Sequence, residues 1–463
     1  MSTPKPTKEA IVLFHEGINA LNRASQYGMP IDVEYCEDVS KKLDKRLKAL
    51  KQNILTSSLG KFWSKIHKNI NINSDQQLAN ILFSKLKFPV IKETEKGNPS
   101  VNAEVLEILK EDRPEIQYIN DYRKIYVAQN TFIKGFLREQ VNGLLHPNYN
   151  LNVARSFRST SSNPNFQNNP KRDKLQKKIV RKAIIPRPGR QIVAMDFGGI
   201  EVRVAACVTG DEKLKYDAVH GDMHRDLAVE CYLLDDFEKK GSEKTLRNGA
   251  KNGFVFPQFY GDYYGNNAPS LLKWGQMPTD RQFKENEGLL LLDGVPLGKH
   301  LINKGIRNPE QFTKHIQKIE NSFWKDRYKT YGKWKEAQIK KYHKEGFLKT
   351  ITGFVCTNIM FKNDITNYPI QGPAFHCLLK AFVEAEKQSI EEEWMSGLIG
   401  QIHDEMVWDA EPSETKLLLE RTGWIMKEWL PKQWPWIDVE LEVEADVYPV
   451  DGSWAEEPET VVL

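Results

Sequence analysis

The chain has 463 residues, of which 40% are hydrophobic and 28% charged, and its formal net charge is +4. This composition is typical of a globular protein with a large core and two or three subdomains, and so small a net charge says little about partners. The five cysteines are scattered and never spaced as CxxC, which argues against a zinc site or a disulfide framework. No apolar run approaches a membrane span and no secretory signal opens the chain, so we expect a cytoplasmic protein without membrane partners.

Charge is distributed unevenly along the sequence. Nine Lys or Arg residues accompany one Asp between positions 41 and 68, and nine more accompany one Asp between 171 and 190, whereas 440–459 is acidic. The two basic runs suggest local surfaces for a polyanion, although a solvated helix face explains a single run equally well.

The first 120 residues read as mainly helical. Ser74 is placed to cap a helix that carries the apolar residues from Leu78 onward, and a second helix is expected over 102–110. A helix over 122–133 then leads into 154–168, which is too rich in Ser, Asn and Pro for a regular element. Its amides, hydroxyls and arginines are side chains that contact phosphates, sugars and base edges, although a flexible linker would look similar.

A short apolar run at 192–195 predicts a buried strand that ends at Asp196. Gly198 and Gly199 allow a sharp turn after it, and the periodicity of 201–208 fits a helix. Taken alone, this stretch favours an aspartate that caps a helix. A carboxylate at the mouth of a buried strand also suits a metal or an ion-pair partner.

Two cations, Arg247 and Lys251, share one helix face because they are four residues apart. With aromatic residues one or two turns further on, they can hold a triphosphate and stack a base, although such a pair is more often solvated. This helix is expected to be weak, because Gly249, Gly253 and Pro257 all disfavour it. We predict a kink or a π-type bulge between Gly253 and Pro257.

The rest of the chain is organised around a second carboxylate. Residues 262–296 read as an insertion, helices follow over 309–343, and a loop or short hairpin is expected at 346–353. The pattern then predicts a long helix over 374–393, a hairpin of strands 398–402 and 405–409 with His403-Asp404 as its turn, and a last strand over 439–445.

Asp196 and Asp404 therefore each end a short apolar strand. If those strands are neighbours, two carboxylates meet at one sheet edge, where two magnesium ions about 3.5–4 Å apart would satisfy both. Arg247, Lys251 and His224 would neutralise a triphosphate. The set is suited to phosphoryl transfer from a nucleotide to a nucleic acid.

With these residues in place, the chain resembles the family A DNA polymerases over almost its entire length. The motifs that carry the resemblance are Asp196-Phe197-Gly198-Gly199-Ile200-Glu201-Val202-Arg203, Arg247…Lys251…Phe256…Tyr260-Gly261, His403-Asp404-Glu405, Arg158 with Ser161-Ser162-Asn163-Pro164-Asn165-Phe166-Gln167-Asn168, and Asn367-Tyr368-Pro369-Ile370-Gln371-Gly372. Each is weak alone, but all five in this order make coincidence very improbable.

The resemblance implies an α+β right-hand polymerase fold with an antiparallel palm sheet, a helical thumb and helical fingers. The thumb with an N-terminal segment would occupy 1–120, the first palm segment 121–219, the fingers 220–345 with the insertion at 262–296, and the second palm segment 346–463.

The family pattern also implies a role for each matching residue. Asp196, the Phe197 carbonyl and Asp404 would bind two Mg²⁺ ions, for which Mn²⁺ could substitute, with Glu405 nearby. The incoming nucleotide would be held by Arg247, Lys251 and His224, selected by Glu201, and contacted by Phe256 and Tyr260, with Lys251 also catalytic. The residues expected along the primer–template DNA are Arg158, Asn165, Gln167, Asn168, Gln371, His403 and Arg203.

Four departures from the family pattern stand out. Gly199 replaces a glutamine, Phe157 replaces a glycine, and the Arg-rich segment expected after Gly353 is absent. The step from Lys251 to Phe256 is five residues where the family has four. Either the helix bulges by one residue, which we prefer, or Val255 and Phe259 take the places of Phe256 and Tyr260.

The expected activity is template-directed addition of dNTPs to a primer, on a chain without proofreading or 5′-nuclease domains. Such a chain fits a virus or mobile element in the host cytoplasm, with a separate exonuclease or processivity protein as a further partner. A single-subunit RNA polymerase and an inactive nucleic-acid-binding relative are the alternatives. A two-metal nuclease would explain the carboxylates but not Arg247 or Lys251.

Overall fold

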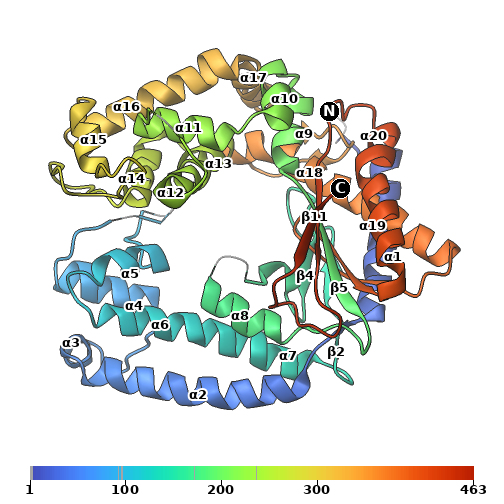
Figure 1. Cartoon of the computed structure of the whole chain (residues 1–463), viewed down its shortest axis with the longest axis horizontal. Helices are drawn as coiled ribbons and strands as arrows, with labels where there is room; N and C mark the ends of the chain where they lie inside the picture. Colours follow the sequence, from blue (N-terminus) through green and yellow to red (C-terminus); the bar gives the residue numbers. More distant parts are fainter. Residues whose placement is uncertain (1–3, 92, 95–96, 171–172, 236) are drawn as a thin grey trace.

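The computed structural model describes residues 4–91, 93–94, 97–170, 173–235 and 237–463, so the first two residues of the second basic run, 171 and 172, lie outside the described residues. Its centre is a five-stranded antiparallel sheet in the order β11-β10-β5-β9-β8 (Figure 1). The strands are β5 (Gln191–Phe197), β8 (Gly397–Ile402), β9 (Glu405–Ala410), β10 (Val443–Val447) and β11 (Glu459–Val462). The α+β architecture predicted from the sequence is confirmed.

Strand β5 is buried on both faces, which explains its nearly unbroken apolar sequence. Val193, Met195 and Phe197 belong to the largest core cluster, whereas Ile192 and Ala194 alternate onto the second one. The first face is covered by α9 (Ile200–Thr209) and α18 (Lys362–Glu391), and α1 (Lys8–Tyr27) packs on α18 and β8. By the same alternation Asp196 lies on the second face, at the end of the strand.

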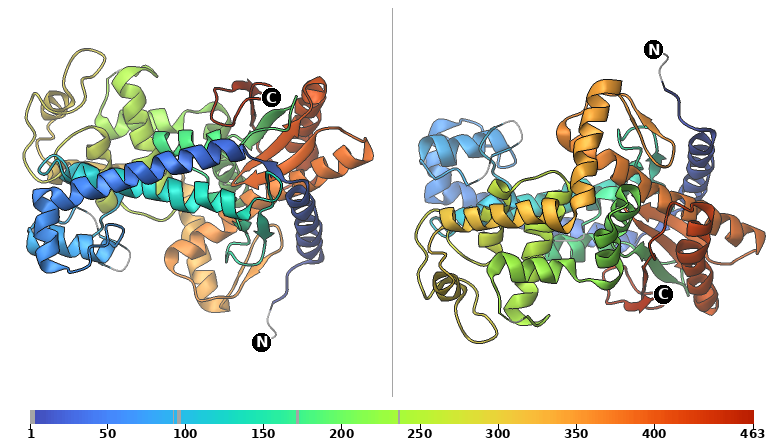
Figure 2. Two further views of the ribbon diagram at one scale, coloured as in Figure 1. Left: turned by 90° about the horizontal axis from the view of Figure 1, so that it is seen from below. Right: turned by 90° about the horizontal axis from the view of Figure 1, so that it is seen from above.

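One helical group extends from the sheet at the bottom of Figure 1. Its long helices α2 (Val33–Thr56) and α6 (Ile116–Val127) pack side by side, and Figure 2 shows α2 reaching well away from the sheet. Ser74 caps α4 (Asp75–Ala79) as predicted, and α3 (Ser58–Ile66) and α5 (Ala103–Leu109) complete the tip. Helix α6 continues through a π-helical segment (Ala128–Ile133) into α7 (Lys134–Glu139).

A second helical group lies at the top of Figure 1, on the same side of the sheet as the first. Figure 2 shows it from above, with the yellow and orange helices spread across it. It contains α10 (Glu212–His220), α11 (Met223–Tyr232), α12 (Gly241–Ala250), a π-helical segment (Lys251–Val255), α13 (Phe256–Phe259), α14 (Tyr264–Trp274), α15 (Leu297–Asn303), α16 (Pro309–Ser322), a further π-helical segment (Phe323–Arg327) and α17 (Lys329–Glu345).

Shorter elements connect these parts. They are β1 (Met29–Pro30), β2 (Leu144–Leu145), β3 (Asn148–Asn150), β4 (Thr160–Ser162), α8 (Lys174–Lys182), β6 (Leu348–Lys349), β7 (Val355–Cys356), α19 (Thr415–Trp424) and α20 (Leu430–Gln433). The polar stretch 154–168 is thus a loop with one short strand, which pairs with β3. Among the described residues, none of the helices combines the length and the hydrophobicity needed to cross a bilayer.

Three sequence predictions about these elements were wrong in extent. The region 262–296 is not wholly a surface insertion, because α14 packs against α16 with Leu271 and Leu272 in the core. Helix α18 begins at Lys362 rather than at 374, with Pro369 and Pro373 inside it. A proline in a helix interior costs about 3 kcal/mol, but here both rings are buried, and burial offsets that cost.

The last of the three is strand β10, which begins at Val443 instead of 439. The reason lies in the carbonyls just before it. Glu440 accepts a hydrogen bond from the Arg203 side chain, and Glu442 accepts one from the amide of Gly198. The bond from Gly198 to Glu442 continues the ladder with β5, but Glu440 bonds to a side chain instead of a strand, so the regular strand does not reach back to 439.

Candidate active site

The two aspartates meet at one end of the central sheet. Strand β5 pairs with β9 so that Asp196 lies opposite Glu405, and Asp404 is the next residue back, in the turn that joins β8 to β9. The strand that ends at Asp196 and the hairpin that carries Asp404 are therefore neighbours, as the sequence analysis required. On its other side Asp196 lies opposite Glu444 of β10. Residues directly opposite point to the same face, so Glu405 and Glu444 flank Asp196 on the face of the second core cluster.

This donor set suits Mg²⁺ rather than a closed protein site. In the described part of the chain, no three His, Cys, Asp or Glu side chains are arranged as a metal cluster. Mg²⁺ in phosphoryl-transfer sites is held by one or two carboxylates together with substrate phosphates and water. Two aspartates at an open turn therefore fit a metal pair that is completed by a bound nucleotide.

The turn that carries Asp404 is held by two glutamines. His403 has a left-handed backbone (φ +56°), and its amide donates to Gln167 Oε1 at 2.7 Å while its carbonyl accepts from Gln401 Nε2 at 2.6 Å. Gln167 Nε2 in turn donates to the side-chain oxygen of Gln401 at 2.9 Å. Gln401 is fully buried, and sequence reasoning missed it. The sequence did contain a signal for Gln401: it is an amide side chain in an otherwise apolar strand, two residues before the turn.

The residues predicted to contact DNA divide into two groups. Asn165, Asn168 and His403 are exposed beside the metal edge, as a DNA surface requires. Gln167 instead uses its side chain within the protein, on the turn described above.

Arg203 was expected along the DNA from the family resemblance, but the structure places it inside the protein. Its side chain is 8% exposed and donates to the carbonyls of Gly198 and Glu440 and to the Glu442 carboxylate. It therefore fixes the turn after Asp196 and does not lie on the DNA surface. The sequence could not show this, because two of its partners lie more than 230 positions away.

The helix that carries Arg247 and Lys251 contains the predicted π turn. The π-helical segment is Lys251–Val255, so it begins two residues earlier than expected. It absorbs the extra residue, because Phe256 and Tyr260 both line the pocket beside Glu201. Val255 is fully buried and Phe259 is 8% exposed, both in the largest core cluster. The predicted π turn is confirmed. That Phe256 and Tyr260, rather than Val255 and Phe259, face a nucleotide stays a prediction.

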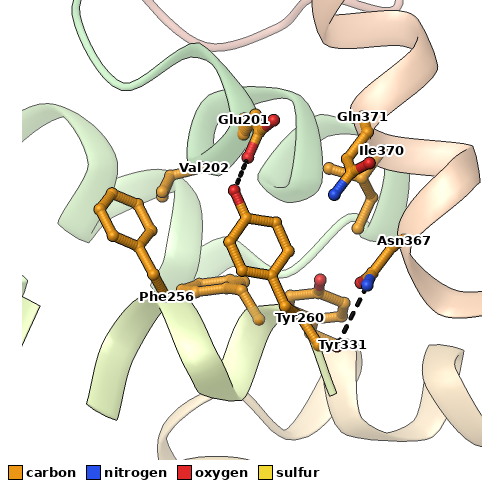
Figure 3. Close-up of a pocket in the computed structure, with 9 residues that line it drawn as sticks. Glu201, Val202, Phe256, Tyr260, Tyr331, Asn367, Ile370 and Gln371 are labelled. Carbon is orange, nitrogen blue, oxygen red and sulfur yellow. Dashed lines mark hydrogen bonds between the residues drawn. The ribbon is translucent and has the colours of Figure 1, made fainter. Parts of the chain in front are cut away.

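The pocket lies between α9, α13, α17 and α18 (Figure 3). Tyr260 donates its hydroxyl to Glu201 Oε2 at 2.5 Å, and Asn367 Nδ2 donates to the Tyr260 carbonyl at 3.1 Å. Arg158 Nη1 is 3.6 Å from Glu201 Oε1, so one carboxylate joins the loop, α9 and the end of α13. The remaining lining residues are Val202, Phe256, Phe259, Tyr331, Ile370 and Gln371.

The electrostatics connect this pocket to the metal edge. Burial raises the pKa of the Tyr260 hydroxyl well above its usual value, and the negative charges of Glu201 and Asp404 raise it further. The Tyr260 hydroxyl therefore stays protonated and donates to Glu201. The charge of Asp404 thus reaches Tyr260 of the pocket, which places the carboxylate edge near the pocket.

Lys251 lies beside Phe256, and Arg247 is bound by Asp222. Arg247 Nε and Nη2 contact the Asp222 carboxylate at 2.8–3.0 Å, and Asp222 also caps α11. Lys251 Nζ is 5.4 Å from the centre of the Phe256 ring, and the His224 ring is 5.8 Å from it. Asp222 was missed by sequence reasoning, although an Asp before the helix of His224 is a recognisable cap. It fixes the guanidinium that faces the site.

His224 is a neutral imidazole at neutral pH. Burial lowers its pKa to about 4, with further lowering by Lys251 and Arg247. A buried histidine elsewhere in the fold, His376, has a pKa lowered to about 3 by burial.

We expect folding stability to fall as the pH drops from 6.5 to about 4. Both histidines take up a proton in the unfolded chain near pH 6.5 but stay neutral in the folded protein until the pH reaches about 4 or 3. Each such proton changes the free energy of unfolding by about 1.4 kcal/mol per pH unit. Urea unfolding across this range should show a shallower slope for His224→Gln than for the wild type. The exposed-site variant His343→Gln should leave the slope unchanged, and equal slopes in all three proteins contradict the assignment.

An antiparallel sheet with carboxylates at one end, and two helical groups extending beyond that end, defines the right-hand fold of nucleic-acid polymerases. A search of solved structures agrees: the POL domain of Pol1 from M. smegmatis, in complex with DNA primer-template and dNTP, superposes with a TM-score of 0.72 at 20% identity, covering 96% of this chain and 70% of that one. The family model of DNA polymerase family A matches residues 33–273, more than half of the chain. The chain belongs to DNA polymerase family A.

Two relatives illustrate the level of similarity. The thermostable DNA polymerase I of Thermus thermophilus is 27% identical over 439 residues, which cover 92% of this chain and 46% of that protein. DNA polymerase I of Geobacillus stearothermophilus is 26% identical over 412 residues, which cover 87% and 41% respectively. The chain thus spans less than half the length of these relatives.

Proposed function

We propose that this chain is a template-directed DNA polymerase that adds dNTPs to a primer 3′ end. The observation that carries the proposal is the continuity of the site: the Asp196–Asp404 edge lies near the pocket of Glu201 and Tyr260, and Lys251 lies beside Phe256. Membership of DNA polymerase family A supports the same activity. A nuclease would need the carboxylates but would have no use for the cations or the pocket.

In this proposal Asp196 and Asp404, with the Phe197 carbonyl, hold two Mg²⁺ ions, for which Mn²⁺ can substitute. When bound, these ions lower the pKa of the primer 3′-hydroxyl and neutralise charge on the triphosphate. The 3′-hydroxyl loses its proton to solvent water as its oxygen attacks the α-phosphorus, the bond from that phosphorus to the oxygen bridging the β-phosphate breaks, and pyrophosphate leaves. Arg247, Lys251 and His224 hold the triphosphate, and Lys251 is suited to give a proton to the leaving pyrophosphate.

The two helical groups are then assigned as thumb and fingers. The sequence placed the thumb within 1–120, the palm in 121–219 and 346–463, and the fingers in 220–345. We propose that the thumb continues through α7, which packs with α6 on α2, and that the fingers begin at α10. Helix α1 packs on α18 and β8, so the N-terminal segment lies with the palm. The DNA would pass the exposed residues Asn165, Asn168 and His403, with Arg158 and Gln371 nearer the pocket. A separate exonuclease or processivity protein remains a proposed further partner.

Primer extension tests the proposal directly. The purified chain with Mg²⁺ should extend a DNA primer on a DNA template with dNTPs, and replacing them by rNTPs should reduce the rate strongly. A preference for rNTPs would support the RNA polymerase alternative. Binding of primer–template without extension would support an inactive relative instead.

We expect Glu201→Ala to relax sugar selection. The Glu201 carboxylate is fixed by Tyr260 and Arg158 beside the pocket, where it blocks the space that a ribose 2′-hydroxyl would need. Its removal should raise rNTP relative to dNTP incorporation by about 10- to 100-fold, as one lost clash and one lost desolvated charge allow. Single-nucleotide incorporation measures the ratio. Glu212→Ala, on the exposed side of the next helix, is the control, and an unchanged ratio in Glu201→Ala contradicts the assignment.

A further inference from the structure

Phe157, the residue before Arg158, has a left-handed backbone with φ +59°. A bulky side chain rarely adopts this conformation, because its Cβ crowds the backbone there, whereas glycine tolerates it. Left-handed non-glycine residues persist where the surroundings hold them, and they gather at functional sites. The contacts around Phe157 show what holds it.

The Phe157 ring lies in an aromatic cluster built from three distant elements. Its centre is 5.0 Å from Phe354, next to β7, and 5.9 Å from Phe14 of α1. His376 of α18 completes the cluster, with its ring 4.2 Å from that of Phe354 and 5.9 Å from that of Phe14. We call Phe14, Phe354 and His376 the aromatic box.

The box also binds the backbone of Phe157. His376 Nε2 lies 3.1 Å from the Phe157 carbonyl, and its Nδ1 lies 2.7 Å from Thr352 Oγ1. Because a carbonyl only accepts, Nε2 carries the proton and donates to Phe157, while Nδ1 accepts from the Thr352 hydroxyl. His376 is completely buried, so this neutral imidazole has no competing water.

The two residues before Phe157 are fixed as well. The Ser156 carbonyl approaches α18 so closely that a Cβ on Gly372 would lie 2.6 Å from its oxygen. The Arg155 carbonyl accepts from the Cys356 thiol at 3.5 Å. The backbone from Arg155 to Phe157 is therefore held by α18 and by the β6–β7 hairpin, and the chain turns at Phe157 toward the site.

We propose that Phe157 is a positioning residue, which acts through Arg158 at the nucleotide pocket. Its left-handed backbone, held by the aromatic box, directs Arg158 to the Glu201 carboxylate, 3.6 Å away, and Glu201 also accepts from Tyr260. Arg158 is thereby placed between the DNA surface and the pocket. The inference rests on the proposed polymerase activity for its kinetic test.

The test compares Phe157→Ala with Phe157→Gly in the full chain. Both variants lose the ring and should lose thermal stability to a similar extent, but only glycine adopts the left-handed backbone freely. Phe157→Ala should lower kcat/KM for dNTP incorporation by about tenfold, and Phe157→Gly by less than about threefold. In the Arg158→Ala background the two changes should differ from each other by less than about twofold, since the residue through which they act is absent.

Equal losses of kcat/KM in the alanine and glycine variants would overturn the proposal, as would a loss in Phe157→Ala that persists without Arg158. Crystal structures of the two variants give a readout independent of polymerisation. Arg158 should remain on Glu201 in Phe157→Gly and move away from it in Phe157→Ala. A wild type that does not extend primers refutes the proposed function, whereas unchanged Arg158 positions in both variants refute the role of Phe157.

Discussion

Replacing Asp404 by alanine should lower the rate of primer extension by about 10³-fold or more, because each metal stabilises several kcal/mol of transition-state charge. Asp404 lies in the turn between β8 and β9, next to the residue that pairs with Asp196. Its removal takes away one of the two aspartates proposed to hold the metal ions, although Glu405 and Glu444 still flank Asp196. Single-turnover extension of a labelled primer measures the loss.

The fold should survive this change, since Asp404 occupies a partly exposed turn that Gln167 and Gln401 hold through His403. We expect the thermal midpoint of Asp404→Ala to stay close to that of the wild type. Asp446→Asn is a matched control, because Asp446 lies on the same face of β10 but opposite Ala194, two residues from Asp196. It should change the rate by less than about twofold. Full activity in Asp404→Ala would show that the metal assignment is wrong.

The central hairpin and strand could be predicted because their signals are local. Short, mainly apolar stretches, ended by Asp196 or by His403-Asp404, specify buried strands and their turns without reference to the rest of the chain. The sequence analysis had to assume that β5 and β9 are neighbours. The pairing of Asp196 with Glu405 shows that they are. The two catalytic candidates were therefore accessible from sequence.

Side chains that support the site through hydrogen bonds inside the protein could not be predicted from the sequence. Arg203 and Gln167 were assigned to DNA from the family resemblance, yet their partners Glu442 and Gln401 lie more than 230 positions away. Nothing in the local sequence reveals such partners. Helix α18 shows the same effect, since Pro369 and Pro373 argue locally against a helix that burial nevertheless stabilises.

The helix that carries Arg247 and Lys251 was predicted in part. Gly249, Gly253 and Pro257 correctly predicted a distortion, because each weakens α-helical hydrogen bonding locally. Its position depends on tertiary contacts: Gly249 and Gly253 pack closely against Trp274 and Ser270 of α14, which hold this stretch against the core. The π turn at Lys251–Val255 lies in this stretch, directly before Phe256, which lines the pocket.

Two alanine substitutions three residues apart should therefore affect different properties: one should lower activity and the other should lower stability. Phe256 lines the pocket beside Lys251 and His224, so Phe256→Ala should lower kcat/KM for dNTPs by roughly 10- to 100-fold, the range of one lost base-stacking contact. Phe259 packs on Tyr331, Phe323 and Trp324 at ring distances of 5.5–6.1 Å. Phe259→Ala should lower the free energy of unfolding by about 3–5 kcal/mol.

Activity and stability together show which register is correct, provided that activity is measured well below the thermal midpoints of both variants. In the bulged register Phe256→Ala retains stability and loses activity, because its ring contacts the nucleotide side. Phe259→Ala loses stability and, once folded, retains most activity, although it also lines the pocket floor. The reverse pattern would mean that Val255 and Phe259 face the nucleotide. In that case the π turn would not compensate for the extra residue between Lys251 and Phe256, and the cations and aromatic rings would lie on different faces of the helix.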